Sequence, residues 1–144
     1  MILFGAAEPR VQAIATLASV ASTVVGVPDL EKELRERGYY PFPNARTKQL
    51  LPVARHAFED GERHSIEAAA RALACPLFLV HGSADEAVPV SSQDAIAAWH
   101  AAPEVLTFDG AGHTFGAVHP FQGPTDALEQ AVDAVAAFFR RTLC

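Results

Sequence analysis

The sequence predicts an α/β fold, a three-layer sandwich in which a parallel sheet lies between two layers of helices. Two short apolar runs, 77–80 and 105–108, are typical of strands in such a sheet, and the first is continuous enough for a strand buried on both faces. Between them, 91–101 has an apolar face at helical spacing, so the order is strand, helix, strand. The segment 125–142 has another apolar stripe at that spacing and predicts a helix packed on the sheet.

Local patterns predict the other elements of this sheet and its helices. Residues 1–7 are apolar and predict the last turns of a helix. Apolar and polar residues alternate in 11–17, which predicts a third strand buried on at least one face. The segment 28–37 predicts a helix that ends at Gly38, and its many charges predict a solvated outer face. A short alanine-rich helix is expected over 65–73.

The segment 28–62 is expected to be a cap-like excursion between two strands of the sheet. It contains an aromatic and proline-rich stretch at 39–43 and a helix-like stretch at 49–60. Excursions of this kind often carry specificity, so Tyr39 and Arg46 are candidate substrate-binding residues. The simpler interpretation, that the aromatic side chains only pack the excursion against the domain, stays open.

An acid and a histidine follow the two predicted strands, at the edge where open α/β sheets bind ligands. Asp85 follows 77–80, and His113 follows 105–108 after two glycines that permit a tight turn. A strand-helix-strand crossover places both carboxyl ends on one edge, about 5 Å apart for neighbouring strands, so we expect the two side chains to meet. A carboxylate that accepts from histidine Nδ1–H is typical of hydrolases. For Asp85 alone, a role only in shaping its loop is the alternative.

Four segments together resemble the C-terminal half of an α/β-hydrolase of the dienelactone-hydrolase and prolyl-oligopeptidase-like group. They are His81-Gly-Ser-Ala-Asp85, Val88-Pro89, Gly110-Ala-Gly-His-Thr-Phe-Gly116 and His119-Pro-Phe121. The resemblance implies a partial α/β-hydrolase fold with its last three strands, in which Asp85 is the triad acid and His113 the triad base. It also implies a serine on a G-x-S-x-G turn, yet the sequence contains no such motif. Ser19 and Ser22 follow a predicted strand without a sharp strand-to-helix turn, so neither fits the nucleophile.

Three functions are compatible with this pattern. In all of them, residues 1–144 form one partial α/β-hydrolase domain. In the first, the chain is the C-terminal part of a serine hydrolase that acts on esters or related acyl compounds, and it is inactive alone. In the second, it is a non-catalytic binding or scaffold domain. In the third, another subunit supplies the serine. His119 is a further candidate substrate-binding residue, although its neighbours Pro120 and Phe121 favour a packing role.

The amino-acid composition limits which kinds of partner and cofactor the protein is expected to bind. The 144 residues are half hydrophobic with a net charge of −6, which argues against nucleic acid and anionic membranes and favours a small uncharged or weakly polar substrate. The resemblance implies that this small molecule is an acyl compound. Two cysteines and scattered histidines predict no disulfide framework, no metal site and no cofactor. Because Met1–Phe4 lacks the pattern of a signal peptide, we expect a cytoplasmic protein. The free side of 11–17 would be an unpaired apolar edge, so we expect the missing N-terminal half or a homo-oligomer to cover it.

Overall fold

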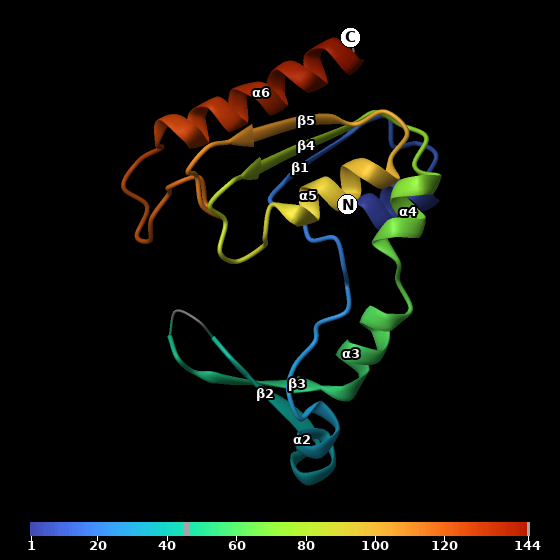
Figure 1. Cartoon of the computed structure of the whole chain (residues 1–144), viewed down its shortest axis with the longest axis vertical. Helices are drawn as coiled ribbons and strands as arrows, with labels where there is room; N and C mark the ends of the chain where they lie inside the picture. The colour runs from blue at the N-terminus through green and yellow to red at the C-terminus, as the bar shows by residue number, and fades with distance from the viewer. Residues whose placement is uncertain (45–46, 144) are drawn as a thin grey trace. The chain divides into compact units, whose positions relative to one another are not determined.

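The computed structural model describes residues 1–44 and 47–143 (Figure 1). The chain divides into two compact units. Unit 1 comprises residues 1–21 together with the chain from Ile66 onward, and unit 2 comprises residues 22–65. Within the described residues, no helix has the length and apolar character that crossing a membrane requires. The cytoplasmic location stays a prediction.

Unit 1 contains a parallel sheet in the order β1-β4-β5, as the sequence predicts. Its strands are β1 (Ile14–Leu17), β4 (Leu77–Gly82) and β5 (Glu104–Phe108). Every residue of β4 is buried, because this strand is paired on both sides and covered on both faces. Pairing begins at Ile14, so the first strand is shorter than the alternation over 11–17 indicates.

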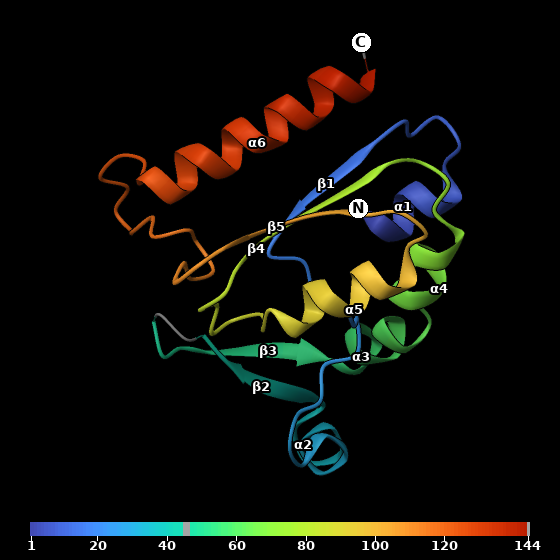
Figure 2. The ribbon, with the colours of Figure 1, turned by 45° about the horizontal axis from the view of Figure 1, so that its top comes forward.

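Helices cover both faces of this sheet, which makes unit 1 a three-layer sandwich (Figures 1 and 2). One face carries α6 (Asp126–Leu143), and the other carries α1 (Ile2–Ala7), α4 (Ile66–Ala72) and α5 (Ser91–Trp99). Alternate residues of β4 therefore enter two separate cores. Leu77 and Leu79 pack in the cluster that includes residues of α1, α4 and α5, and Phe78 and Val80 pack in the cluster that includes α6.

Helix α6 is the clearest example of a helix that its own sequence defines. Thr125 precedes it, and its Oγ1 accepts a hydrogen bond from the Leu128 N–H at 3.2 Å, which is the interaction expected of an N-cap. Ala131 and Phe138 are completely buried on its inner stripe, and the Phe138 ring lies 5.3 Å from that of Phe78. The predicted helix over 125–142 is thus confirmed.

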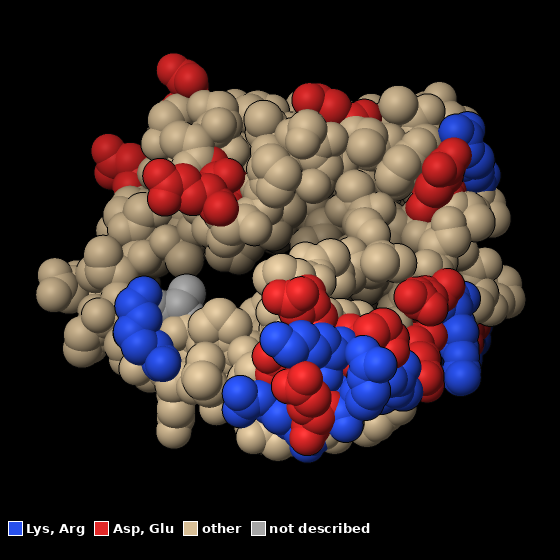
Figure 3. All heavy atoms as spheres, turned by 60° about the horizontal axis from the view of Figure 1, so that its bottom comes forward, with Lys and Arg blue, Asp and Glu red and all other residues tan. Residues whose placement is uncertain are grey.

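Unit 2 begins with the predicted charged helix, α2 (Leu30–Arg37). Its single buried residue is Leu34, and Arg37 pairs with Glu33 one turn earlier at 2.6 Å. Gly38 ends the helix with a φ of +77°, a conformation that glycine adopts without strain. Acidic and basic side chains alternate on the charged face of Figure 3, so this face carries no single-signed patch of the kind that binds nucleic acid.

The helix predicted over 49–60 is wrong in its first half. Residues Leu50–Ala54 form strand β3, which pairs antiparallel with β2 (Tyr39–Pro43), and only Arg55–Glu62 is helical, as α3. The reason is Pro52, which has no N–H to donate and disfavours a helix interior but is tolerated in a two-stranded hairpin whose strands are both edges.

Candidate active site

The loops that follow β4 and β5 approach each other closely at the carboxyl edge of the sheet. Backbone bonds join them beyond the strands: Ser83 N–H donates to Phe108 O at 2.9 Å, and Ala84 N–H donates to Ala111 O at 3.0 Å. A Cβ on Gly82 would lie 2.2 Å from that Ala111 carbonyl oxygen. Only glycine fits at this position, so the close contact between the two loops explains the glycine in His81-Gly-Ser-Ala-Asp85.

The Ser83 hydroxyl fixes the start of the second loop. Its Oγ donates to Asp109 Oδ1 at 3.0 Å and accepts from Gly110 N–H at 2.8 Å. Gly110 has a φ of +69°, which turns the chain back toward the first loop. The loop that carries His113 is therefore held by side-chain and backbone bonds from the loop that carries Asp85.

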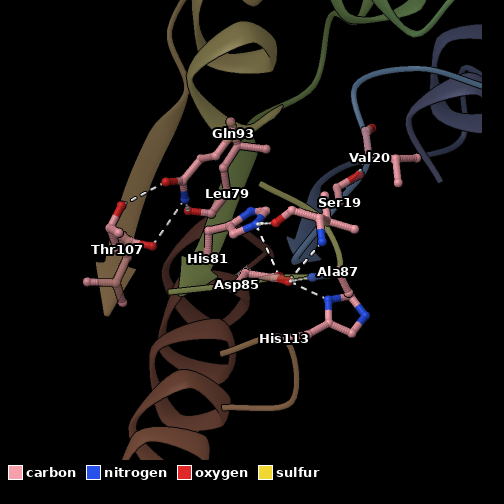
Figure 4. A network of polar contacts seen from close by, with 11 residues as sticks. Ser19, Val20, Leu79, His81, Asp85, Ala87, Gln93, Thr107 and His113 are labelled. Atoms are coloured by element: carbon pink, nitrogen blue, oxygen red, sulfur yellow. Dashed lines mark hydrogen bonds and ion pairs between the residues drawn. The ribbon is translucent and has the colours of Figure 1, made fainter. Parts of the chain in front are cut away.

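Asp85 and His113 meet, as the sequence predicts (Figure 4). His113 Nδ1 lies 2.9 Å from Asp85 Oδ2; the acid side chain is 0% exposed and the histidine side chain 46% exposed. The other oxygen, Oδ1, accepts from the N–H groups of Ala87 at 2.9 Å and Val88 at 2.8 Å. Asp85 thus also shapes its loop, so the structural role considered for it and the contact with His113 coexist on one carboxylate.

The environment keeps Asp85 ionised. Burial raises the pKa of this carboxyl, but hydrogen bonds from Val88 N–H, His113 and Ala87 N–H together outweigh burial and leave the pKa below its ordinary value. Because a carboxylate can only accept, the proton of a neutral His113 lies on Nδ1, and Nε2 keeps its lone pair. That second nitrogen points away from Asp85 (Figure 4) and is free to accept a proton.

Two buried polar residues of the site were not identified from the sequence. His81 is 1% exposed, and its Nε2 lies 2.9 Å from Val88 O and 3.3 Å from Asp85 Oδ2. Gln93, on α5, donates through Nε2 to Leu79 O at 3.0 Å and accepts through Oε1 from Thr107 Oγ1 at 2.7 Å. A polar side chain on an otherwise buried surface needs a partner, and that signal is visible in the sequence, although the partner is not.

The other predicted site residues lie elsewhere. His119 is exposed in the loop before α6, at a cis peptide bond with Pro120. Tyr39 is the first residue of β2 in unit 2, and Arg46 lies outside the described residues. A substrate-binding role for each of these three residues stays a prediction.

No candidate nucleophile is hydrogen-bonded to His113 among the residues that the structure describes. Within the described part of the chain, no serine, threonine or cysteine side chain is hydrogen-bonded to its ring. The hydroxyl of Ser19, which follows β1, is 3.4 Å from Val20 O. Ser22 lies in unit 2. Among the residues described, no group of three or more His, Cys, Asp or Glu side chains is arranged to hold a metal ion.

Comparison with known proteins identifies the fold. No family model and no curated protein matches the sequence. Among solved structures, the esterase domain of a Rhodothermus marinus protein matches with a TM-score of 0.70 and 16% identity over 99% of this chain and 57% of its own. Est1E from Butyrivibrio proteoclasticus matches with a TM-score of 0.70 and 17% identity, over 99% of this chain and 56% of its own. The α/β-hydrolase GrgF from Penicillium sp. sh18 matches with a TM-score of 0.73 and 15% identity, over 98% of this chain and 59% of its own.

These likenesses and the sheet topology define a partial α/β-hydrolase fold. The chain spans slightly more than half the length of the solved proteins it matches. A further match is Est1E with bound ferulic acid, with a TM-score of 0.67 and 17% identity over 99% of this chain and 54% of that one. At such identities the likeness concerns the fold alone.

Proposed function

We propose that this chain is the acid and histidine part of a serine hydrolase acting on esters or related acyl compounds. The observation that supports this proposal is the contact of 2.9 Å between a buried, ionised Asp85 and a half-exposed His113 at the carboxyl edge of a parallel sheet. A carboxylate that only capped a loop would not need an imidazole on its second oxygen. As part of the proposal, we retain the resemblance to the dienelactone-hydrolase and prolyl-oligopeptidase-like group.

In the proposed reaction, His113 transfers protons and Asp85 orients it. A serine hydroxyl loses its proton to His113 Nε2 as its oxygen bonds to the acyl carbon. The bond to the leaving group then breaks, and the leaving group takes that proton from Nε2. Water repeats the sequence on the acyl-serine and regenerates the serine. Throughout, Asp85 stays ionised; it keeps the Nδ1–H tautomer and stabilises the imidazolium that forms.

The serine and the oxyanion hole would come from further strands that join the sheet at β1. The chain has no G-x-S-x-G turn, and β1 is a terminal strand of the order β1-β4-β5. Next to that free edge, Leu17 and Val20 are 42% and 47% exposed. These strands belong to the same polypeptide or to another subunit. Without them, this chain is inactive, because catalysis that survives loss of a triad residue depends on the oxyanion hole and substrate binding.

Carboxylic esters are the substrates to try first. One matched structure, Est1E, holds ferulic acid, a carboxylic acid of the kind that ester hydrolysis releases. The alternative function, a non-catalytic binding or scaffold domain, is favoured by one observation: no hydroxyl or thiol is hydrogen-bonded to His113 in the described residues.

The test expresses the chain together with whatever open reading frame lies upstream of Met1, and measures ester hydrolysis and labelling by a fluorophosphonate. We expect the extended protein to hydrolyse p-nitrophenyl acetate and to be labelled on a serine outside residues 1–144, and we expect the chain alone to do neither. In the extended protein, His113→Ala should lower kcat by about 10³-fold or more. An extended protein that is neither active nor labelled would favour the scaffold alternative, and labelling of a serine within 1–144 would overturn the external nucleophile.

A further inference from the structure

We propose that His81 is a positioning residue, which holds the turn that directs Asp85 toward His113. The proposal rests on the function proposed above and adds a residue to the same site. His81 lies in β4 and is one of the largest completely buried side chains of the chain. A buried imidazole must have a hydrogen-bond partner, and that of His81 is the Val88 carbonyl; the nearby Asp85 carboxylate belongs to the same loop, which follows its own strand.

This partner fixes the tautomer of His81. Its Nε2 lies 2.9 Å from the carbonyl oxygen of Val88, and a carbonyl can only accept, so Nε2 carries the proton. The N–H of the same Val88 donates to Asp85 Oδ1 at 2.8 Å. Val88 is therefore held at both of its backbone polar groups, by His81 on one side and by Asp85 on the other. This arrangement closes the turn from 85 to 88 onto the end of β4.

The carboxylate itself also lies close to His81. His81 Nε2 lies 3.3 Å from Asp85 Oδ2, the oxygen that also lies 2.9 Å from His113 Nδ1 (Figure 4). Backbone N–H groups hold Oδ1 and His113 Nδ1 lies against Oδ2, while the Nε2 proton of His81 is directed to Val88 O, so His81 acts on the carboxylate chiefly through the turn. Removing His81 would leave the Val88 carbonyl without this donor and loosen the turn. We infer that Asp85 would then hold Nδ1–H of His113 less firmly.

His100 provides a matched control. It is a second buried imidazole of unit 1 that bonds a backbone carbonyl, with Nε2 3.3 Å from Cys75 O, and its Nδ1 accepts from Ala102 N–H at 3.3 Å. Both partners precede β4 and β5, at the ends of these strands opposite to Asp85 and His113. Replacing His100 therefore reproduces the loss of a buried histidine without changing the contacts among His81, Val88 and Asp85.

The experiment reads the tautomers of the histidines by two-bond proton-nitrogen correlation NMR on the full, ¹⁵N-labelled chain. In the wild type, we expect His113 to be protonated on Nδ1 and His81 on Nε2. In His81→Met, which keeps length but has no donor, the ratio of the Nδ1–H to the Nε2–H form of His113 should fall by about fivefold to tenfold, the change expected for one hydrogen bond. His81→Gln, whose amide can donate to Val88 O, should restore most of the ratio. His100→Met should leave it unchanged.

Three results would overturn the proposal: an unchanged His113 tautomer in a folded His81→Met, an equal change in His100→Met, or a wild-type His81 protonated on Nδ1 alone. If His81→Met does not fold, the wild-type His81 tautomer and the His81→Gln spectrum decide. None of these measurements needs activity or a nucleophile. Failure of the positioning role is therefore distinguishable from failure of the proposed hydrolase, which the ester and fluorophosphonate assays test.

Discussion

Asp85 Oδ2 and His113 Nδ1 lie 2.9 Å apart, although the two residues come from different loops and are 28 positions apart in the chain. The contact forms because parallel strands joined by a helix end at the same edge of the sheet. The loops are then drawn together by backbone bonds, and Gly82 leaves room for the Ala111 carbonyl. The chemistry of the site therefore depends on the junction between these two loops as much as on the two side chains.

Asp85→Asn should change how stability depends on pH. The pKa of Asp85 is lower in the folded chain than its ordinary value of 3.8, so its carboxylate stabilises the fold above about pH 4, and this contribution is lost as the pH falls through the lowered folded value. Asparagine has no such dependence and also loses one charged hydrogen bond, about 1.5–3 kcal/mol at neutral pH. Urea unfolding at pH 7 and at pH 3 should therefore show a difference between wild type and variant that shrinks in acid. Glu86→Gln, at an exposed neighbouring acid, is the control. A difference that is the same at both pH values would contradict the role of Asp85 ionisation.

Gly82→Ala should separate the two loops. The added methyl would lie 2.2 Å from Ala111 O, a backbone atom that cannot move alone, so we expect a loss of about 1–3 kcal/mol or more in the free energy of unfolding. The His113 ring resonances should also shift toward those of an exposed imidazole. Gly26→Ala is the control, because nothing lies within 4 Å of the position that an added Cβ would take. Equal stability of the two variants would show that the loop junction is not tight.

Phe138→Ala tests the core beneath α6. The ring is completely buried and packs against the rings of Phe78 and Phe139, at 5.3 Å and 5.2 Å between centroids. Its removal should cost about 3–5 kcal/mol, measured by denaturant unfolding. The exposed Phe121 is the control, and Phe121→Ala should change stability little. A small effect of Phe138→Ala would mean that α6 contributes little to the stability of unit 1.

Much of unit 1 could be predicted because its signals are local. The continuous apolar run at 77–80, the stripe of α6 and the crossover between β4 and β5 together determine the sheet order and bring Asp85 to His113. The apolar spacing in 49–60 favours a helix and so does not reveal the hairpin of unit 2, although Pro52 argues against a helix there. Pairing between strands is a longer-range property than the pattern within either one.

The role of His81 illustrates what a sequence pattern does not contain. A histidine after an apolar run indicates a buried polar group, but its partner is a backbone carbonyl, with a carboxylate oxygen nearby, and the positions of both depend on the turn at 85–88. For Asp85, the sequence predicts contact with His113 or a role in shaping its loop, and does not indicate that both occur; a catalytic role stays a prediction. Its two oxygens make both sets of contacts, and only coordinates assign them separately.

The unpaired edge of β1 is expected to make the isolated chain self-associate. The N–H of Ile14 donates to Pro76 O at 3.0 Å and that of Ala18 to Val80 O at 2.9 Å, both toward β4. Because N–H groups alternate along a strand, the N–H of Leu17 points away from β4, toward the free edge. We expect the isolated chain to associate through this edge in a concentration-dependent way, as sedimentation velocity would measure.

Two variants of Leu17 separate association through the backbone from association through the apolar side chain. Leu17→Pro removes the outward N–H without removing a bond to β4, so it should leave unit 1 folded and shift the chain toward the monomer. Leu17→Ala keeps the N–H and should still associate. Equal loss of association in both variants would assign it to the exposed side chain, whose area both remove. A wild-type chain that stays monomeric at high concentration and unfolds cooperatively would contradict the need for a partner strand altogether, since an edge that tolerates solvent does not require one.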